Sequence, residues 1–187
     1  MTQFSFNADP GHWQQVDPGT DPVQYFAQWD DTPASPWKLL LSWHAEWALR
    51  WANGFGSAAW LLADEPTGIA AAVAPLAADG PEEIAGMQEA VALVERLVDR
   101  GIADPLVSEA SFAGLGGYAV TQVHELPPEL AEMADEGAML QMLQTVFVAA
   151  DGAGNVVYAA VSPQLSNMAG YVLLPVAAAL ETARWHD

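Results

Sequence analysis

The chain has 187 residues, of which 52% are hydrophobic and 16% are charged, and it contains no Cys. This composition is typical of a globular protein, and the length predicts one domain over residues 1–187 with a sizeable core. The 24 acidic residues outnumber the 5 Lys and Arg, giving a formal net charge of −19. The negative electrostatic field around such a chain disfavours nucleic acid and anionic membranes as partners and favours a basic protein.

The sequence also bears on the compartment. Without Cys the chain cannot hold a disulfide, a thiolate nucleophile or a zinc–thiolate site, and a reducing compartment fits this composition. The N-terminus has neither a basic start nor an apolar stretch, and no window reaches the roughly 18 apolar residues of a membrane span. We therefore expect a cytoplasmic protein that does not bind membranes.

Residues 1–35 are rich in Asp, Pro, Gly and Gln, and they predict a loosely structured arm with two short strands, 13–16 and 23–27. Between these strands, Asp17-Pro18-Gly19 predicts a turn, because Pro fixes φ and Gly adopts conformations that other residues avoid.

The segment 37–60 contains five of the eight Trp residues, and its apolar positions fit both a strand and a helix. The boundaries favour a helix, because Ser35 is a good N-cap, Pro36 suits the first helical position, and Asn53-Gly54 is a stop signal.

The next elements follow from turn and capping signals. Segments 58–63 and 69–73 predict a hairpin, and 81–100 predicts a long helix that begins at Pro81 and ends before Gly101. Its expected buried face consists of Ile84, Met87, Val91, Val94 and Val98.

The remaining elements complete an α+β pattern. Segments 105–112 and 117–125 predict two strands, and Pro127-Pro128 predicts the start of a short polar helix that runs to about Asp135. Segment 139–162 predicts a central hairpin that turns at 151–155, because both of its strands are largely apolar. Ser166 is expected to cap a final helix, kinked or restarted at Pro175, whose inward residues are Met168, Tyr171, Val172, Val176, Ala179 and Ala183.

From about Gly80 to Trp185, the string LGGYAVTQVHEL, the hairpin MLQMLQTVFVAADGAGNVVYAAVSP and the terminal helix resemble the PsbP-like α/β/α sandwich group. That group includes Eag-type secretion chaperones and small lipoproteins. The resemblance implies an antiparallel sheet with helices packed against it, in a mostly non-enzymatic protein. It also implies strands where the Trp-rich segment predicts a helix, so the two interpretations conflict there.

Motifs that would indicate catalysis are weak. The pattern G-x-G-x-x-[GA] occurs at 54–59 and at 114–119, but Pro66 follows the first too closely and a strand follows the second. The histidines His12, His44, His124 and His186 lack the spacing of a zinc site. We therefore expect no cofactor, no metal and no catalytic residue that sequence alone can name, and an enzyme built from distant residues stays open.

Two groups of residues are candidates for partner binding. The Trp cluster is either core or an exposed anchor, since Trp is enriched in both settings. The sequence predicts a protein-binding domain, such as an immunity protein or a secretion chaperone or adaptor, that uses an acidic surface to bind a basic partner. A carrier of a small apolar ligand at the Trp cluster is the alternative. The candidate residues are Trp43, Trp47 and Trp51, with the acidic Glu129, Glu132, Asp135 and Glu136.

Overall fold

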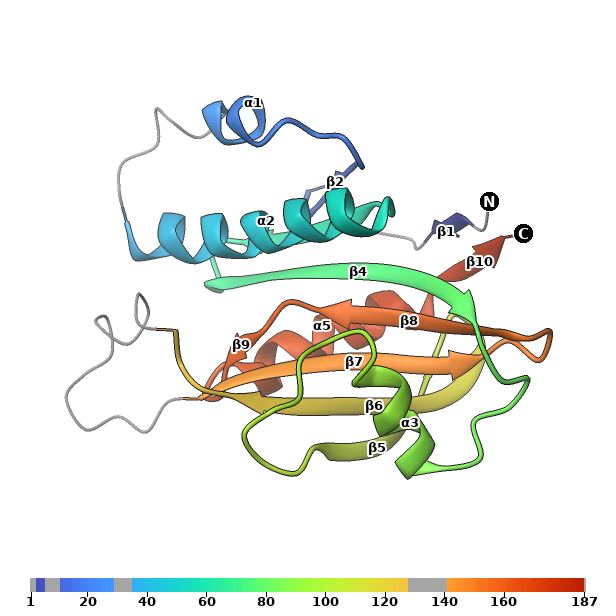
Figure 1. Ribbon diagram of the computed structural model, residues 1–187. Helices are drawn as coiled ribbons and strands as arrows, with labels where there is room; N and C mark the ends of the chain where they lie inside the picture. The colour runs from blue at the N-terminus through green and yellow to red at the C-terminus, as the bar shows by residue number, and fades with distance from the viewer. Residues whose placement is uncertain (1–2, 6–10, 29–34, 128–140, 187) are drawn as a thin grey trace.

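The computed structural model describes residues 3–5, 11–28, 35–127 and 141–186, and its centre is one antiparallel sheet (Figure 1). Seven strands cross it in the order β2-β3-β4-β8-β7-β6-β5, and β9 pairs with β7. Their bounds are β2 Trp13–Val16, β3 Ala59–Asp64, β4 Ile69–Asp79, β5 Leu106–Phe112, β6 Leu115–His124, β7 Met142–Ala150, β8 Asn155–Val161 and β9 Gln164–Leu165. A separate ribbon pairs β1 (Gln3–Ser5) with β10 (Arg184–His186).

Helices cover both faces of this sheet. Figure 1 shows α3 (Met87–Val94) in front of the sheet and α5 (Ala169–Glu181) behind it, and α2 (Pro36–Phe55) packs in the same core as α3. Val146 and Val148 of β7 belong to the core under α2 and α3, whereas Phe147 belongs to the core under α5. The predicted fold class is confirmed: α+β, an antiparallel sheet with helices packed against both faces.

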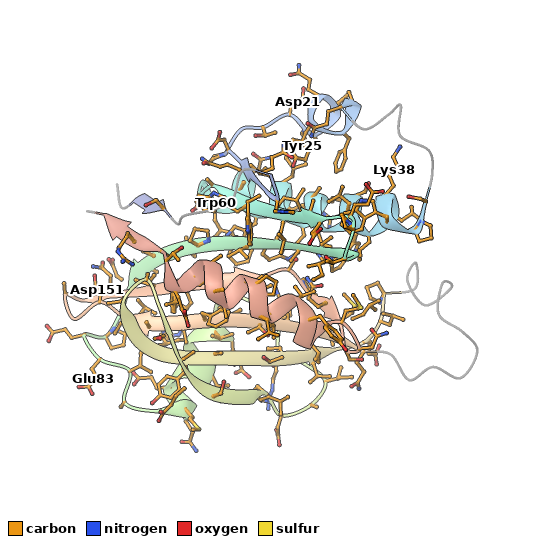
Figure 2. All side chains as sticks on the ribbon, turned by 180° about the vertical axis from the view of Figure 1, so that it is seen from behind. Asp21, Tyr25, Lys38, Trp60, Glu83 and Asp151 are labelled. Atoms are coloured by element: carbon orange, nitrogen blue, oxygen red, sulfur yellow. The ribbon has the colours of Figure 1, made fainter. Side chains whose placement is uncertain are left out.

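The predicted central hairpin is also confirmed. Strands β7 and β8 lie in the middle of the sheet, and Val146 and Val157 are both fully buried. At the turn, which Figure 2 marks with Asp151, this carboxylate accepts hydrogen bonds from the backbone N–H groups of Ala153 (2.8 Å) and Asn155 (3.0 Å). Gly152 and Gly154 have φ angles of 76° and 91°, which favour Gly.

The Trp-rich segment is a helix, as its boundaries predict. Ser35 Oγ accepts a hydrogen bond from Lys38 N at 3.1 Å, and Pro36 occupies the first helical position. The helix ends at Phe55, one residue after the predicted stop at Asn53-Gly54, because Gly56 adopts a left-handed conformation with φ 65°.

The predicted helix over 81–100 is wrong in extent, because α3 covers only 8 residues. The Asp79-Gly80 pair belongs to the sheet instead: Asp79 pairs with Asn155, and Gly80 N donates to Gly154 O at 2.9 Å. The residues that follow form bends at 82–83, and the helix begins only at Met87. The buried face also differs from the prediction, because Met87 is 50% exposed. The buried residues of α3 are Ala90, Leu93 and Val94.

A second correction concerns the N-terminal arm. Strand 13–16 is confirmed as β2, but the predicted strand 23–27 lies in helix α1 (Pro22–Ala27), which packs on α2 (Figure 1). The signal for this helix is Asp21 before Pro22: the Asp21 carboxylate accepts from Val23 N at 2.9 Å, which is an N-cap contact.

The remaining predictions are largely confirmed. Segments 58–63 and 69–73 form β3 and β4, and 105–112 and 117–125 form β5 and β6. The final helix forms as α5 and continues through Pro175, but it starts at Ala169 rather than beside Ser166. Tyr171 was expected to face inward and is 68% exposed. The buried residues of α5 are Ala169, Val172, Val176 and Leu180.

The predicted polar helix from Pro127 to Asp135 lies almost entirely outside the described residues. Among the described helices, none combines the length and the apolar character that a membrane crossing requires.

Candidate functional site

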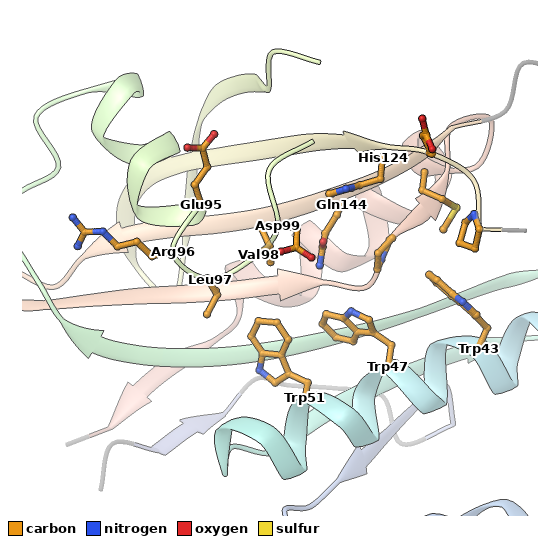
Figure 3. A pocket seen from close by; sticks show the side chains of 14 residues that line it. Trp43, Trp47, Trp51, Glu95, Arg96, Leu97, Val98, Asp99, His124 and Gln144 are labelled. Atoms are coloured by element: carbon orange, nitrogen blue, oxygen red, sulfur yellow. The ribbon is translucent and has the colours of Figure 1, made fainter. Parts of the chain in front are cut away.

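A pocket of about 420 Å³ separates α2 from the segment that follows α3 (Figure 3). The ends of β6 and β7 also line it. Its volume lies in the range of ligand pockets, and its lining combines aromatic, apolar and charged side chains. The lining residues are Trp43, Trp47, Trp51, Glu95, Arg96, Leu97, Val98, Asp99, His124, Glu125, Pro127, Met142, Gln144 and Pro163.

Three Trp residues form one wall of the pocket. Trp43, Trp47 and Trp51 are four residues apart, so they project from one face of α2, as Figure 3 shows. The rings of Trp47 and Trp51 are stacked with centroids 5.1 Å apart, and Phe55 continues the row at 4.5 Å from Trp51. Trp51 is 7% exposed, whereas Trp43 and Trp47 are half-buried. Trp51 therefore belongs to the core and also lines the pocket, whereas Trp43 and Trp47 line the pocket and are only half-buried.

The opposite wall is the segment from Glu95 to Asp99, and a close backbone contact fixes its position. Gly101 N donates to Gln122 Oε1 at 3.1 Å, and Ile102 N donates to Val123 O at 2.7 Å. A Cβ atom at position 101 would lie 2.5 Å from Val123 O, so only Gly permits this approach. The sequence predicts Gly101 at a helix end; in the structure, Gly101 instead holds the segment before it against β6.

Polar groups of the pocket carry unmet hydrogen-bonding capacity. Nε2 of His124 and Nε1 of Trp51 are buried and have no hydrogen-bond partner in the part of the chain that the structure describes. Burial lowers the pKa of His124, and the nearby Asp99 carboxylate opposes this shift. Buried polar groups without a hydrogen-bond partner cost free energy.

The charge of the pocket is negative. Glu95, Asp99 and Glu125 line it against one cation, Arg96. Figure 3 shows Arg96 extending away from the Trp side chains, whereas Asp99 lies beside Gln144 on the side that faces them. Glu95 Oε1 is 3.6 Å from Arg100 Nε, so Glu95 is partly neutralised.

Beneath this wall, His44 links α2 to the sheet. His44 Nδ1 is 2.8 Å from Ser162 Oγ, which also accepts a hydrogen bond from Ala72 N at 2.8 Å. Gln164 Nε2 donates to Ser162 O at 3.1 Å. His44 is 1% exposed and Ser162 is 0% exposed, and burial lowers the pKa of His44 to about 3. Although the pair contains a nucleophile and a base, it is enclosed in the core, and its role is to orient α2 and the adjacent Trp43, whose ring is 4.9 Å from the imidazole.

The other predicted residues are placed as follows. Glu129, Glu132, Asp135 and Glu136 lie outside the described residues. The two glycine patterns form no cofactor loop: Gly56 caps α2, and Gly114 lies in the β5–β6 turn. Within the described ranges, no group of three or more His, Asp or Glu has the arrangement of a metal site. The pocket itself was not predicted as a unit, because Asp99, His124 and Gln144 join the Trp wall only through tertiary packing.

No protein-family model matches the chain, and no curated protein matches it. Among solved structures, the chain is similar to LpqN, described as involved in cell envelope biogenesis of Mycobacterium tuberculosis. The TM-score is 0.39 at 12% identity, and the match covers 100% of this chain and 92% of LpqN. A likeness at this level carries no functional inference for this chain.

Proposed function

We propose that this chain is a non-enzymatic protein-binding domain, such as an immunity protein or a secretion chaperone or adaptor, that binds a basic partner. The observation that carries the proposal is the pocket in which Trp43 and Trp47 lie opposite Asp99. Half-buried Trp residues are preferred interface anchors, and the carboxylate supplies the charge complementarity that a basic partner requires.

The charge of the whole chain supports the same proposal. A net charge of −19 steers a basic protein toward the surface and repels nucleic acid and anionic lipid. We propose the cytoplasm as the compartment, because a chain without Cys fits a reducing environment. The α/β/α layering is compatible with the proposed PsbP-like resemblance, from which helix α2 departs.

The test is capture of a stoichiometric partner from the source cell by the purified chain, followed by calorimetry with the isolated partner. A basic partner is expected. Trp43→Ala and Trp47→Ala should each weaken binding by more than tenfold, because anchor truncations cost about 2 kcal/mol or more.

The matched controls are Tyr171→Ala and Leu174→Ala, which remove exposed side chains of α5 on the opposite face of the sheet. They should leave affinity unchanged. Binding that is unaffected by the Trp substitutions, or lost with the α5 substitutions, would contradict the proposal.

A second candidate, a carrier of a small apolar ligand, is favoured by the pocket volume and by the apolar Leu97, Val98 and Met142 in its lining. Native mass spectrometry of the chain purified without denaturation distinguishes it. A retained small molecule that Trp47→Ala releases would support the carrier.

A further inference from the structure

The space between Trp43 and Trp47 differs from the rest of the aromatic wall. One face of Trp47 is covered by Trp51, with which it stacks. Toward Trp43, Trp47 borders two hollows: the main pocket, and a smaller one of about 80 Å³ lined by Trp43, Glu46, Trp47 and Arg50. Figure 3 shows Trp43 set apart from the Trp47–Trp51 pair. We call the space between Trp43 and Trp47 the Trp slot.

The slot depends on the orientation of Trp43. Trp47 and Trp51 have the same helical spacing and stack directly, whereas the Trp43 ring packs edge-to-face on His44 with centroids 4.9 Å apart, and a hollow lies between Trp43 and Trp47. A flat group can stack on the face of Trp47 that Trp51 leaves uncovered. The faces of Trp attract cations, and they do so best where water is partly excluded. Both rings are half-buried, so the slot meets this condition.

The surrounding charge selects a cation. Asp99 lines the main pocket, and Figure 3 shows it on the side that faces Trp47. Glu46, beside the smaller hollow, is paired with Arg50, and Glu95 is paired with Arg100. Of the remaining pocket carboxylates, Asp99 and Glu125, Asp99 is the one that Figure 3 shows facing Trp47, so we choose it as the partner of a bound cation. A carboxylate opposite an aromatic face is the setting that a guanidinium occupies well, because it stacks on the ring and donates hydrogen bonds from its edge.

We propose that the Trp slot binds an arginine side chain of the basic partner, stacked between Trp43 and Trp47 and paired with Asp99. The inference rests on the proposed function, since it names the partner group that the pocket recognises. Lysine is the poorer occupant, because its ammonium is compact and strongly hydrated and cannot fill a flat space.

The test uses three capped tripeptides, acetyl-Gly-X-Gly-amide, in which X is arginine, lysine or citrulline. Citrulline has nearly the same shape as arginine but no charge. Each is titrated into the full ¹⁵N-labelled chain while the indole N–H signals are recorded. The arginine peptide should shift the signals of Trp43 and Trp47 saturably, and it should bind about fivefold tighter than the citrulline peptide, with lysine between them. Trp60, buried under α5, should not shift.

Two variants make the result specific. Trp43→Ala should abolish the arginine response. Asp99→Asn changes an exposed side chain, keeps the fold, and should reduce arginine binding about threefold while it leaves citrulline binding unchanged. Equal binding of arginine and citrulline, or no effect of Asp99→Asn, would overturn the inference.

If a basic partner is captured but the arginine peptide does not bind, the slot inference fails and the proposed function stands. If the arginine peptide binds and no basic partner is captured, the proposed function fails.

Discussion

His44 shows how one buried side chain couples stability to pH. Its Nδ1 is bonded to Ser162, its Nε2 has no partner among the described residues, and burial lowers its pKa to about 3. The imidazole is therefore neutral in the folded chain over the physiological range, and its protonation would place an unpaired charge in the core.

The pH dependence follows from the sign of this shift. The pKa of His44 is about 3 when folded and about 6.5 when unfolded, so the unfolded chain takes up the proton first as pH falls. The contribution of His44 is fully present above about pH 6.5 and is lost progressively toward pH 3. The free energy of unfolding should fall by up to about 1.4 kcal/mol per pH unit in this window. Denaturant titrations of the native chain and of His44→Gln should show a steeper fall for the native chain; parallel curves would contradict the assignment.

Gly101 is a second residue with a specific structural demand. Gly101→Ala places a Cβ atom 2.5 Å from Val123 O, so the segment carrying Asp99 must move. We expect a loss of about 1–3 kcal/mol in unfolding free energy and weaker partner binding. The control is Gly54→Ala in α2, where nothing lies within 4 Å of the new methyl group and helix propensity predicts equal or greater stability. Similar melting temperatures for the two variants would argue against this account of Gly101.

At the scale of elements, local signals explain why most strands and α2 could be predicted. Ser35-Pro36 marks the start of α2, and the turn around Asp151 marks the central hairpin, and both signals lie within a few residues of what they determine. The errors have a different origin. The Asp79-Gly80 pair resembles a helix start, but it is part of the sheet, because it pairs with β8 and the turn beside it, about 75 residues away in sequence. Tyr171 fits a helical apolar face, yet the rotation of α5 on the sheet exposes it.

The central hairpin supplies the strongest test at this scale. Val146 is fully buried between β6 and β8. Val146→Asp would bury an unpaired carboxylate, at a cost of several kcal/mol out of a typical stability of about 5–15 kcal/mol. Thermal unfolding followed by circular dichroism should show a large loss of stability or no folded protein. Leu106→Asp, on the exposed edge strand β5, should have little effect. An unchanged melting temperature for Val146→Asp would mean that the hairpin is not central.

At the scale of the whole molecule, the strand order assembles the pocket from distant parts of the sequence. Helix α2 packs on β4, which is followed across the sheet by β8, β7 and β6, and α2 from the first third of the chain shares a pocket with the ends of β6 and β7 from the last two thirds. Composition predicted an acidic surface and a Trp cluster, but it could not predict that Asp99 and His124 lie opposite these Trp residues. That arrangement depends on which strands pair with each other, and a local sequence pattern does not predict pairing between distant strands.

The most direct test of the central claim is the association rate of the captured partner, measured by stopped-flow Trp fluorescence at 10 mM and 150 mM salt. The Debye length shrinks from about 30 Å to about 8 Å over this range, so steering by the acidic surface is screened. We predict a rate that falls by at least tenfold, with a fluorescence change that Trp43→Ala and Trp47→Ala reduce. A rate independent of salt, with a fluorescence change that survives both substitutions, would contradict binding of a basic partner at this pocket.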